Sequence, residues 1–434
     1  MRNIIIVGGG AGGIILATDL GRRLGKKKIA RVTLIDKQLT HIWKPLLHEI
    51  AAGSLNSYTD ELNYFAHARK NHFEFLPGEL QNIDRENKKI TLAEYRDIKD
   101  HIVMPVVDIA YDILILAIGS VCNDFNTDGA DQHCVFMDSR KQAEHFHQTL
   151  ISHYVSAQRN AMPDQQLDIC IVGAGATGVE LAAELHQTAH TLNRYGLNAI
   201  KAQHVRVTLV EAASRVLPAM PERMALAAQR ELEELGVRVL CGEKVTGINA
   251  TTIHTASDRH ILADIKVWSA GIKGPNFLQN IAGLETTPSN QLVVRKTLQS
   301  TRDDNIFAIG DCASLTLTTE AGELFRVPPR AQSAYQQAKI LAKSLIGNIR
   351  NNDNLLDFTY KDHGSLVSLA NENAIGNLSN ALFGTINFEG IIARFMYLML
   401  YRMHQAALHG WPTTLLIICR DILNRSTGPR LKLH

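Results

Sequence analysis

The chain has 434 residues, of which 45% are hydrophobic and 20% charged, which is typical of a globular protein with two or three domains. A net charge of +2 gives no reason to expect nucleic-acid binding. The six cysteines are scattered and form no C-x-x-C pair, which argues for a reducing compartment and against a zinc site or a redox disulfide. We expect no bound metal. Neither a signal peptide nor an uncharged apolar run of about 18 residues is recognisable, so we expect no leader and no membrane-spanning helix.

The first stretch of the chain has the pattern of a dinucleotide-binding strand, loop and helix. An apolar run over residues 4–7 predicts a strand buried on both faces of a parallel sheet, and residues 14–24 continue with helical spacing. Between them lies a G-x-G-x-x-G fingerprint formed by Gly8, Gly10 and Gly13. Such glycines let the backbone approach a pyrophosphate at the N-terminus of the helix. A second strand ends in Asp36, which is placed to bind a ribose diol, so the stretch predicts a dinucleotide site.

The next segments are expected to complete this first unit. Pro45 and the apolar residues after it predict a loop that enters a short helix packed over the cofactor. Lys44 is expected either to pair with a phosphate or the ring of that cofactor, or to be solvated. Residues 111–119 then predict another buried strand, which ends in Gly119.

A second complete fingerprint follows a predicted helix over 139–158. Residues 168–172 form an apolar strand, and the loop after it contains Gly173, Gly175 and Gly178 in the same spacing. The next strand ends in Glu211, an acid that favours NAD over NADP because a 2′-phosphate would meet a carboxylate. Arg215, four residues later, weakens that preference.

Two similar closing strands indicate an internal repeat. The strand 265–271 ends in Gly271, as the strand 113–119 ends in Gly119. Two dinucleotide folds in one chain imply two dinucleotides that meet at their interface.

A third motif indicates that the first domain is discontinuous. The strand over 305–311 ends in Gly310 and Asp311, and the carboxylate is expected where a flavin ribitol and pyrophosphate would pass; alternatively it only caps a turn. We therefore predict an α/β protein with two Rossmann-like domains of the flavin disulfide reductase type. The boundaries are 1–125 and 295–350 for an FAD domain, 160–294 for an inserted NAD(H) domain, and 351–434 for a C-terminal region.

The last two predicted elements indicate functions other than nucleotide binding. A helix beginning at Arg330 carries Gln332 and Gln336 on one side, where they would face either a polar, redox-active substrate or solvent. The tail over about 389–425 contains two apolar segments, each shorter than the about 20 residues that span a bilayer. Its arginines, tyrosines and Trp411 predict an amphipathic helical hairpin that lies in a membrane surface. The alternative is a buried core or a helix pair in a homodimer.

With these motifs, the whole chain resembles the bacterial type II NADH dehydrogenases, which are NADH:quinone oxidoreductases that do not pump protons. The resemblance rests on HIWKPLLHEIAAGSL at 41–55, IVGAGATGVELAAEL at 171–185, IFAIGDCA at 306–313, VPPRAQSAYQQA at 327–338 and YKDHGSLVSL at 360–369. The C-terminal helix resembles the proteobacterial branch. Many flavin disulfide reductases share the two fingerprints, whereas the glutamine-rich stretch and the tail are more selective.

The resemblance implies particular site residues. FAD would be bound by the residues of the first loop and its partners: Gly8, Gly10, Ala11, Gly12, Gly13, Asp36, Lys44, Gly119, Asp311, Ala331 and Gln332. NADH would be bound by the corresponding set of the second loop: Gly173, Gly175, Gly178, Glu180, Glu211 and Gly271. Glu180 matches a glutamate near the nicotinamide in this family, although it could also only complement the helix dipole. Gln332 and Gln336 match glutamines of the quinone site.

The expected reaction is hydride transfer from NADH to FAD, followed by two-electron reduction of a membrane quinone without proton pumping. The protein would lie peripherally on the cytoplasmic face of the bacterial inner membrane, at the entry to a respiratory chain, with Glu180 or water as proton donor. A sulfide:quinone reductase would need a redox cysteine pair, which is not recognisable, and a soluble ferredoxin or rubredoxin reductase would lack the apolar tail. A non-enzymatic NAD-sensing membrane protein would not need the flavin motifs.

Overall fold

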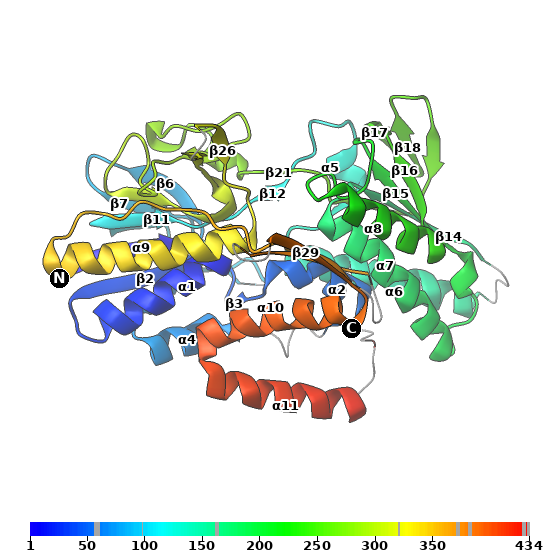
Figure 1. Ribbon diagram of the computed structural model, residues 1–434, viewed down its shortest axis with the longest axis horizontal. Coiled ribbons are helices and arrows are strands. Elements are labelled where there is room, and N and C mark those ends of the chain that lie inside the picture. The colour runs from blue at the N-terminus through cyan, green and yellow to red at the C-terminus, as the bar shows by residue number, and fades with distance from the viewer. Residues whose placement is uncertain are drawn as a thin grey trace. The chain divides into compact units, whose positions relative to one another are not determined.

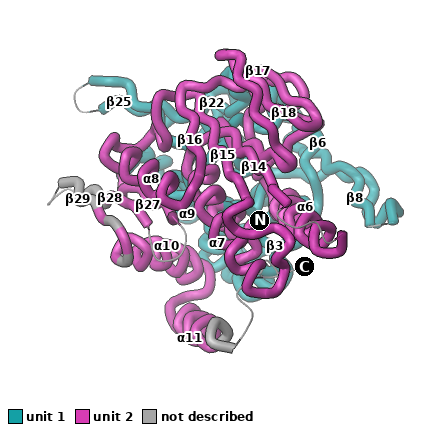
Figure 2. Tube along the Cα trace, turned by 90° about the vertical axis from the view of Figure 1, so that its right-hand side faces the viewer, with its two compact units in different colours: residues 1–44, 61–121, 272–361 teal, residues 45–60, 122–271, 362–434 magenta. Residues whose placement is uncertain are grey.

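The computed structural model (Figure 1) describes residues 1–55, 61–97, 99–160, 165–319, 322–369, 374–380, 384–427 and 431. The chain divides into two compact units, each assembled from three segments (Figure 2). Unit 1 comprises Met1–Lys44, Glu61–Val121 and Ile272–Lys361. Unit 2 comprises Pro45–Asp60, Cys122–Gly271 and Asp362–His434.

Unit 1 is built on a parallel five-stranded sheet with the order β23-β11-β1-β2-β5. Its strands are β1 (Arg2–Val7), β2 (Ala30–Asp36), β5 (Glu74–Pro77), β11 (Ile113–Leu116) and β23 (Ile306–Ala308). Helices α1 (Ala11–Leu20) and α9 (Ala331–Asn351) pack against each other, and α4 (Tyr64–Asn71) precedes β5. An antiparallel sheet of β6 (Leu80–Asp84), β7 (Lys89–Leu92) and β10 (Val107–Ala110) completes the unit.

Unit 2 contains a second parallel sheet, with the order β13-β20-β14-β15-β16. Its strands are β13 (Val135–Phe136), β14 (Leu167–Val172), β15 (Val205–Glu211), β16 (Arg238–Cys241) and β20 (Ile265–Trp268). The helices that accompany this sheet are α6 (Arg140–Arg159), α7 (Ala176–Arg194) and α8 (Glu222–Glu234). Trp268 closes an apolar core between the sheet and the antiparallel strands β17 (Val245–Ile248), β18 (Thr252–Thr255) and β19 (His260–Leu262).

The two parallel sheets repeat one arrangement. In unit 1, β1 lies between β11 and β2, and in unit 2, β14 lies between β20 and β15. The inner residues of these strands are mostly apolar and buried, as expected for a parallel sheet covered on both faces. The predicted α/β class with two Rossmann-like folds is therefore confirmed, and so is the internal repeat.

The remaining part of unit 2 surrounds α7. Helix α2 (Leu47–Ala52) packs on α6 and α7, and ends at Gly53 with a φ of +81°. Strands β27 (Ser365–Ser368), β28 (Ala374–Asn380) and β29 (Gly384–Glu389) form an antiparallel sheet that contacts α10 (Ile391–His409). Helix α11 (Trp411–Thr427) packs back on α10 after a break at Gly410.

Among the described residues, none of the helices combines the length and the apolar character that a bilayer crossing requires.

Candidate functional site

The first glycine loop brings bare backbone to the N-terminus of α1. Gly8 has a φ of +102°, and a Cβ at Gly8 would clash with the carbonyl oxygen of Ala117, just after the neighbouring strand β11. A Cβ at Gly13 would clash with the carbonyl oxygen of Gly8, so the loop closes only with glycine at both positions. The cap residue of α1 is Gly10, which supplies no side chain to bond the first N–H groups of the helix. These N–H groups are therefore directed at the space that a pyrophosphate would fill.

Asp36 ties this loop to the end of β2. Its Oδ2 accepts a hydrogen bond from the backbone N–H of Gly9 at 2.6 Å, and its Oδ1 accepts one from Gln38 at 2.7 Å. Burial raises the pKa of the Asp36 carboxyl, while these two N–H groups oppose that rise. A carboxylate has about four acceptor positions, so lone pairs remain for a ribose diol.

Two side chains clamp the carbonyl group of Gly9. The Tyr64 hydroxyl donates to this oxygen at 2.7 Å, and Nδ1 of His41 lies 2.9 Å from it. Burial lowers the pKa of His41 to about 4, so the ring is neutral near pH 7 and its Nδ1–H donates. The clamp fixes the Gly9–Gly10 peptide, which follows directly on the Gly8–Gly9 peptide whose N–H donates to Asp36. Neither Tyr64 nor His41 was predicted from the sequence as part of the site.

Asp311 lies in a second polar constellation of unit 1. Its Oδ2 accepts a hydrogen bond from the Ser120 hydroxyl at 2.9 Å, and the Ser120 carbonyl accepts one from Nζ of Lys44 at 2.9 Å. Burial raises the pKa of Asp311, and the Ser120 hydroxyl and the charge of Lys44 lower it. Gly119, with a φ of +79°, has open space where a side chain would be. The structure thus brings together three predicted residues, Lys44, Gly119 and Asp311.

These observations test whether the residues fit FAD. The first loop offers helix N–H groups without a side-chain cap for a pyrophosphate, Asp36 offers acceptors for a ribose, and open space adjoins Gly119. Gly310, which precedes Asp311, has a φ of +74° and donates its N–H to Oε1 of Gln337 at 2.7 Å. The donor and acceptor set fits a flavin dinucleotide. Gln337 is only 2% exposed, and its supporting role was not predicted from the sequence.

The two predicted quinone-site glutamines lie on α9 against the end of unit 1. Gln336 uses both ends of its amide on the backbone of Lys361, donating from Nε2 at 2.7 Å and accepting at Oε1 at 3.0 Å. Nε2 of Gln332 lies 3.4 Å from the Tyr360 hydroxyl. Ala331 begins the helix. Both glutamines therefore hold the segment at 360–361 in addition to any role toward a ligand.

The second glycine loop repeats the hydrogen bonds of the first. Gly173 has a φ of +103° and donates to Val210, as Gly8 donates to Ile35. Glu211 accepts from the N–H of Ala174 at 2.7 Å and from that of Ala213 at 2.9 Å, which is the pattern of Asp36. The N-terminal cap residue of α7 is Gly175, and a Cβ on it would meet no atom within 4 Å. A Cβ on Gly178 would clash with the carbonyl oxygen of Gly173, as a Cβ on Gly13 would clash with that of Gly8. Unit 2 thus has an equivalent arrangement, and we call residues 8–13 with Asp36 the first cradle and residues 173–178 with Glu211 the second cradle.

Two residues beside this cradle bear on its specificity and shape. The guanidinium of Arg215 donates to the backbone oxygens of Pro218 and Met220, at 3.3 and 3.0 Å, within its own loop. These hydrogen bonds stabilise the conformation of that loop. Gly271 has a φ of +61°, and a Cβ there would press on the Phe125 ring.

Glu180 is a buried acid in the first turns of α7. It is 6% exposed, its Oε1 accepts the backbone N–H of Ser368 at 3.0 Å, and its Oε2 lies 3.3 Å from Nδ1 of His48. Burial raises the pKa of Glu180 well above the ordinary value, and the nearby Glu49 and Glu184 raise it further. A carboxyl with a raised pKa keeps its proton to a higher pH than an ordinary glutamate, which suits a general acid.

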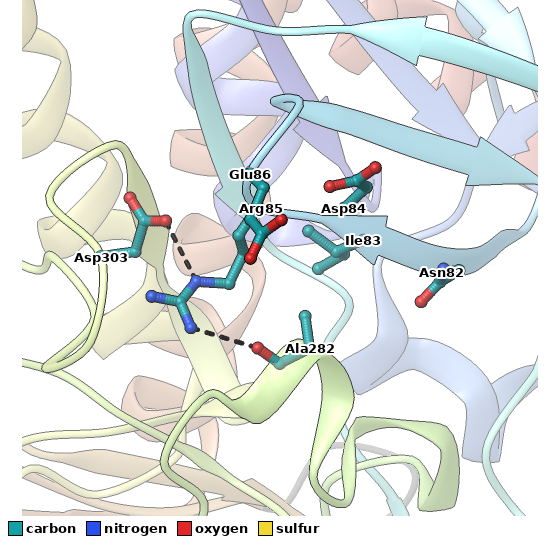
Figure 3. Close-up of a pocket in the computed structure, with 7 residues that line it drawn as sticks. All are labelled: Asn82, Ile83, Asp84, Arg85, Glu86, Ala282 and Asp303. Carbon is teal, nitrogen blue, oxygen red and sulfur yellow. Dashed lines mark hydrogen bonds and ion pairs between the residues drawn. The ribbon is translucent and has the colours of Figure 1, made fainter.

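A surface pocket of about 560 Å³ lies elsewhere in unit 1 (Figure 3). Arg85 in this pocket bonds the Asp303 carboxylate at 3.1 Å and the Ala282 carbonyl at 3.2 Å. The pocket contains none of the predicted site residues. We interpret Arg85 as a clamp between β6 and the loops around Ala282 and Asp303.

Comparisons with known proteins identify the family. The sequence profile of the family described as "Pyridine nucleotide-disulphide oxidoreductase" matches residues 2–338. A protein of Haemophilus influenzae named type II NADH:quinone oxidoreductase is 45% identical over 450 aligned residues, which cover 100% of each chain. The chain belongs to the type II NADH:quinone oxidoreductases. The resemblance inferred from the sequence motifs is confirmed.

More distant relatives agree with this assignment. A type II NADH:quinone oxidoreductase of Staphylococcus aureus is 29% identical over 384 residues, covering 86% of this chain and 89% of its own. The fold matches a solved structure of NDH2 from Plasmodium falciparum in complex with NADH, with a TM-score of 0.82, 20% identity and coverage of 99% and 100%. It also matches the sulfide:quinone oxidoreductase of Aquifex aeolicus, with a TM-score of 0.74, 17% identity and coverage of 94% and 92%. Both structural matches show a shared fold.

The cysteines distinguish this oxidoreductase from disulfide-using relatives of the same fold. None of the six, which all lie in the described part of the chain, forms a disulfide bond. Cys312 follows Asp311 but donates its S–H to the backbone oxygens of Leu116 and Ile309, and burial raises its pKa to about 11. A thiol of this kind is structural and unreactive.

Proposed function

We propose that the two glycine loops divide the family's NADH:quinone reaction between them. Residues 8–13 with Asp36, Lys44, Gly119 and Asp311 bind FAD, and residues 173–178 with Glu211 and Gly271 bind NADH. The observation that carries this division is the Asp311–Ser120–Lys44 constellation in unit 1, which adds a carboxylate and a cation beside the first cradle. FAD supplies the chemistry of accepting a hydride from NADH and passing two electrons to a quinone. The protein binds and orients these molecules.

The division predicts opposite effects of two matched substitutions. Asp36→Ala removes the carboxylate from the first cradle and should lower the FAD content of the purified protein. Glu211→Ala removes the equivalent carboxylate from the second cradle and should raise the KM for NADH about tenfold, as expected for about 1.4 kcal/mol of lost binding, while the FAD content stays at the parent level. If Glu211→Ala loses FAD and Asp36→Ala retains it, the assignment is reversed.

We assign proton delivery to Glu180, contact with the flavin ring to Ala331 and Gln332, and contact with the quinone to Gln332 and Gln336. The support for Glu180 is its burial and raised pKa. Glu180→Gln keeps the shape of the side chain but cannot exchange a proton, so quinone turnover should fall and its dependence on pH should change. Full turnover in this variant would exclude Glu180 as a required donor.

We also propose that α10 and α11 lie in the surface of a membrane, at the cytoplasmic face of a bacterial inner membrane, where NADH is available. The two helices expose large apolar side chains, namely Ile392, Phe395, Leu400, Met403, Trp411, Leu415, Leu416, Ile422 and Leu423. The ion pair of Arg402 with Asp421, at 2.9 Å, holds the helices together. An apolar helical face of this kind inserts to a depth of about 5–10 Å without spanning the bilayer.

Sedimentation with vesicles of anionic phospholipid tests this proposal. Phe395→Ser and Leu416→Ser combined should release the protein into the supernatant, as should deletion of 389–434. Leu324→Ser, at a side chain that is 80% exposed on β26 (Leu324–Arg326) of unit 1, is the matched control and should not. If the double variant still sediments but changes from dimer to monomer, the apolar face is a homodimer interface instead.

A further inference from the structure

Unit 2 contains a buried polar cluster that joins helix α10 to the acid Glu180. The cluster is made from α2, α7, β27 and α10, and its members are His48, Glu49, Glu180, Glu184, Ser368, Arg394 and Tyr397. All but Glu49 and Arg394 are less than a tenth exposed. Such a concentration of acids is costly to bury without compensating charge or hydrogen bonds.

Arg394 reaches Glu180 through one intermediate residue. Nη1 of Arg394 donates to the Ser368 hydroxyl at 2.6 Å, and the backbone N–H of Ser368 donates to Oε1 of Glu180 at 3.0 Å. Ser368 is fully buried at the end of β27, so the arginine fixes the position of the N–H group that orients the carboxyl. The guanidinium carbon of Arg394 also lies 5.8 Å from the centre of the Tyr397 ring.

Among the described residues of the cluster, Arg394 is the cation that compensates the negative charge of the carboxyls. Three carboxyls face the cluster from α2 and α7, and burial lowers the pKa of His48 to about 3, so its ring is neutral. The Tyr397 hydroxyl carries no positive charge and has no hydrogen-bond partner among the described residues. The charge of Arg394 lowers the pKa of both Glu180 and Glu184, against the effect of burial.

The same helix has a second, outward face. Over residues 392–397, Ala393 and Tyr397 are 0% and 4% exposed, whereas Ile392 and Phe395 are 62% and 63% exposed. Arg394 therefore stands between the cluster and the surface by which α10 would meet a membrane. A shift of α10 would move the guanidinium relative to Ser368.

We propose that Arg394 is a positioning residue for Glu180. By holding Ser368, Arg394 makes proton exchange at Glu180 depend on the position of α10 against β27. This inference rests on the proposed role of Glu180 as proton donor. Arg394 itself touches no reacting atom in this scheme. It sets where the donor carboxyl lies and how readily it gives up its proton.

The test uses the full-length FAD-loaded protein and the variants Arg394→Met, Arg394→Lys and Ser368→Ala. The protonated-carboxyl infrared band of Glu180, identified by its loss in Glu180→Gln, is titrated against pH, together with the pH profile of quinone reduction. In Arg394→Met both midpoints should rise by about one pH unit, because an opposite charge and an oriented N–H are lost. Arg394→Lys restores the charge and should bring the midpoints part of the way back.

Ser368→Ala covers the case in which Arg394→Met does not fold, since it removes only the hydroxyl that Arg394 holds. It should raise the midpoints in the same direction by a smaller amount. Arg402→Gln, at an arginine of the same helix that pairs with Asp421, should leave both midpoints in place. FAD content and the reduction of the flavin by NADH should match the parent protein in all four variants.

The outcomes separate the two proposals. If Glu180→Gln abolishes the pH inflection but Arg394→Met and Ser368→Ala leave it unmoved, the positioning role is wrong and the role of Glu180 stands. An unchanged pH profile in Glu180→Gln overturns the role of Glu180, and the positioning role with it.

Discussion

The clamp on the Gly9 carbonyl gives a prediction that isolates one hydrogen bond. Tyr64→Phe removes the hydroxyl and keeps the ring, which stacks on Phe75 with centroids 4.9 Å apart. The lost bond is 2.7 Å long and lies where Tyr64 is 2% exposed. A buried hydrogen bond contributes about 0.5–1.5 kcal/mol net. His41 still donates to the same oxygen, so we expect about 1 kcal/mol, which corresponds to a roughly fivefold higher dissociation constant for FAD.

Removing both donors should cost more than the sum of the single substitutions. With Tyr64→Phe and His41→Leu combined, the Gly9 carbonyl loses both side-chain donors, and leaving a buried carbonyl unpaired costs about 1–3 kcal/mol. The excess over additivity measures the clamp itself.

The assay is titration of the deflavinated protein with FAD, followed by flavin fluorescence. Tyr111→Phe is the matched control, because Tyr111 is also buried in unit 1 and its hydroxyl has no hydrogen-bond partner among the described residues. It should bind FAD like the parent. Parental affinity in Tyr64→Phe, with strictly additive effects in the double variant, would refute the clamp.

Two further predictions concern the same cradle. Burial lowers the pKa of His41 to about 4, below the ordinary 6.5, so the native state binds fewer protons than the unfolded state between these values. Stability should therefore fall as pH decreases from about 6.5 to about 4, by roughly 3 kcal/mol for this group, and His41→Gln should flatten the dependence of the melting temperature on pH over that range. Gln337→Leu leaves the Gly310 N–H unpaired beside Asp311 and should destabilise unit 1 by about 1–3 kcal/mol, with loss of FAD during purification; equal melting temperatures would contradict this.

The sequence predicts the two cradles well because their determinants are local. The spacing of the glycines and the acid at the end of the next strand follow from the geometry of one strand, loop and helix, so Asp36 and Glu211 could be placed without tertiary information. The fold class follows from the same pattern, repeated. Even the loop contact of Asp36 with Gly9 is a consequence of adjacent parallel strands.

The supporting residues could not be predicted because their contacts join distant segments. Tyr64 is 55 residues from Gly9, and Ser368 is 188 residues from Glu180. The hydrophobic periodicity of the sequence does not predict which distant residues form such pairs. Gln336 shows the related difficulty that a residue type fits two roles: its amide could face a substrate, yet the structure bonds both ends of it to the backbone of Lys361.

The most direct test of the central claim is anaerobic reduction and reoxidation of the bound flavin in the purified protein. Addition of NADH should bleach the yellow flavin, and a short-chain quinone should then restore the colour with one quinone consumed per NADH. If NADH leaves the flavin of the FAD-replete protein oxidised, or if the reduced flavin is not reoxidised by quinone, the proposed route from NADH through FAD to quinone is contradicted.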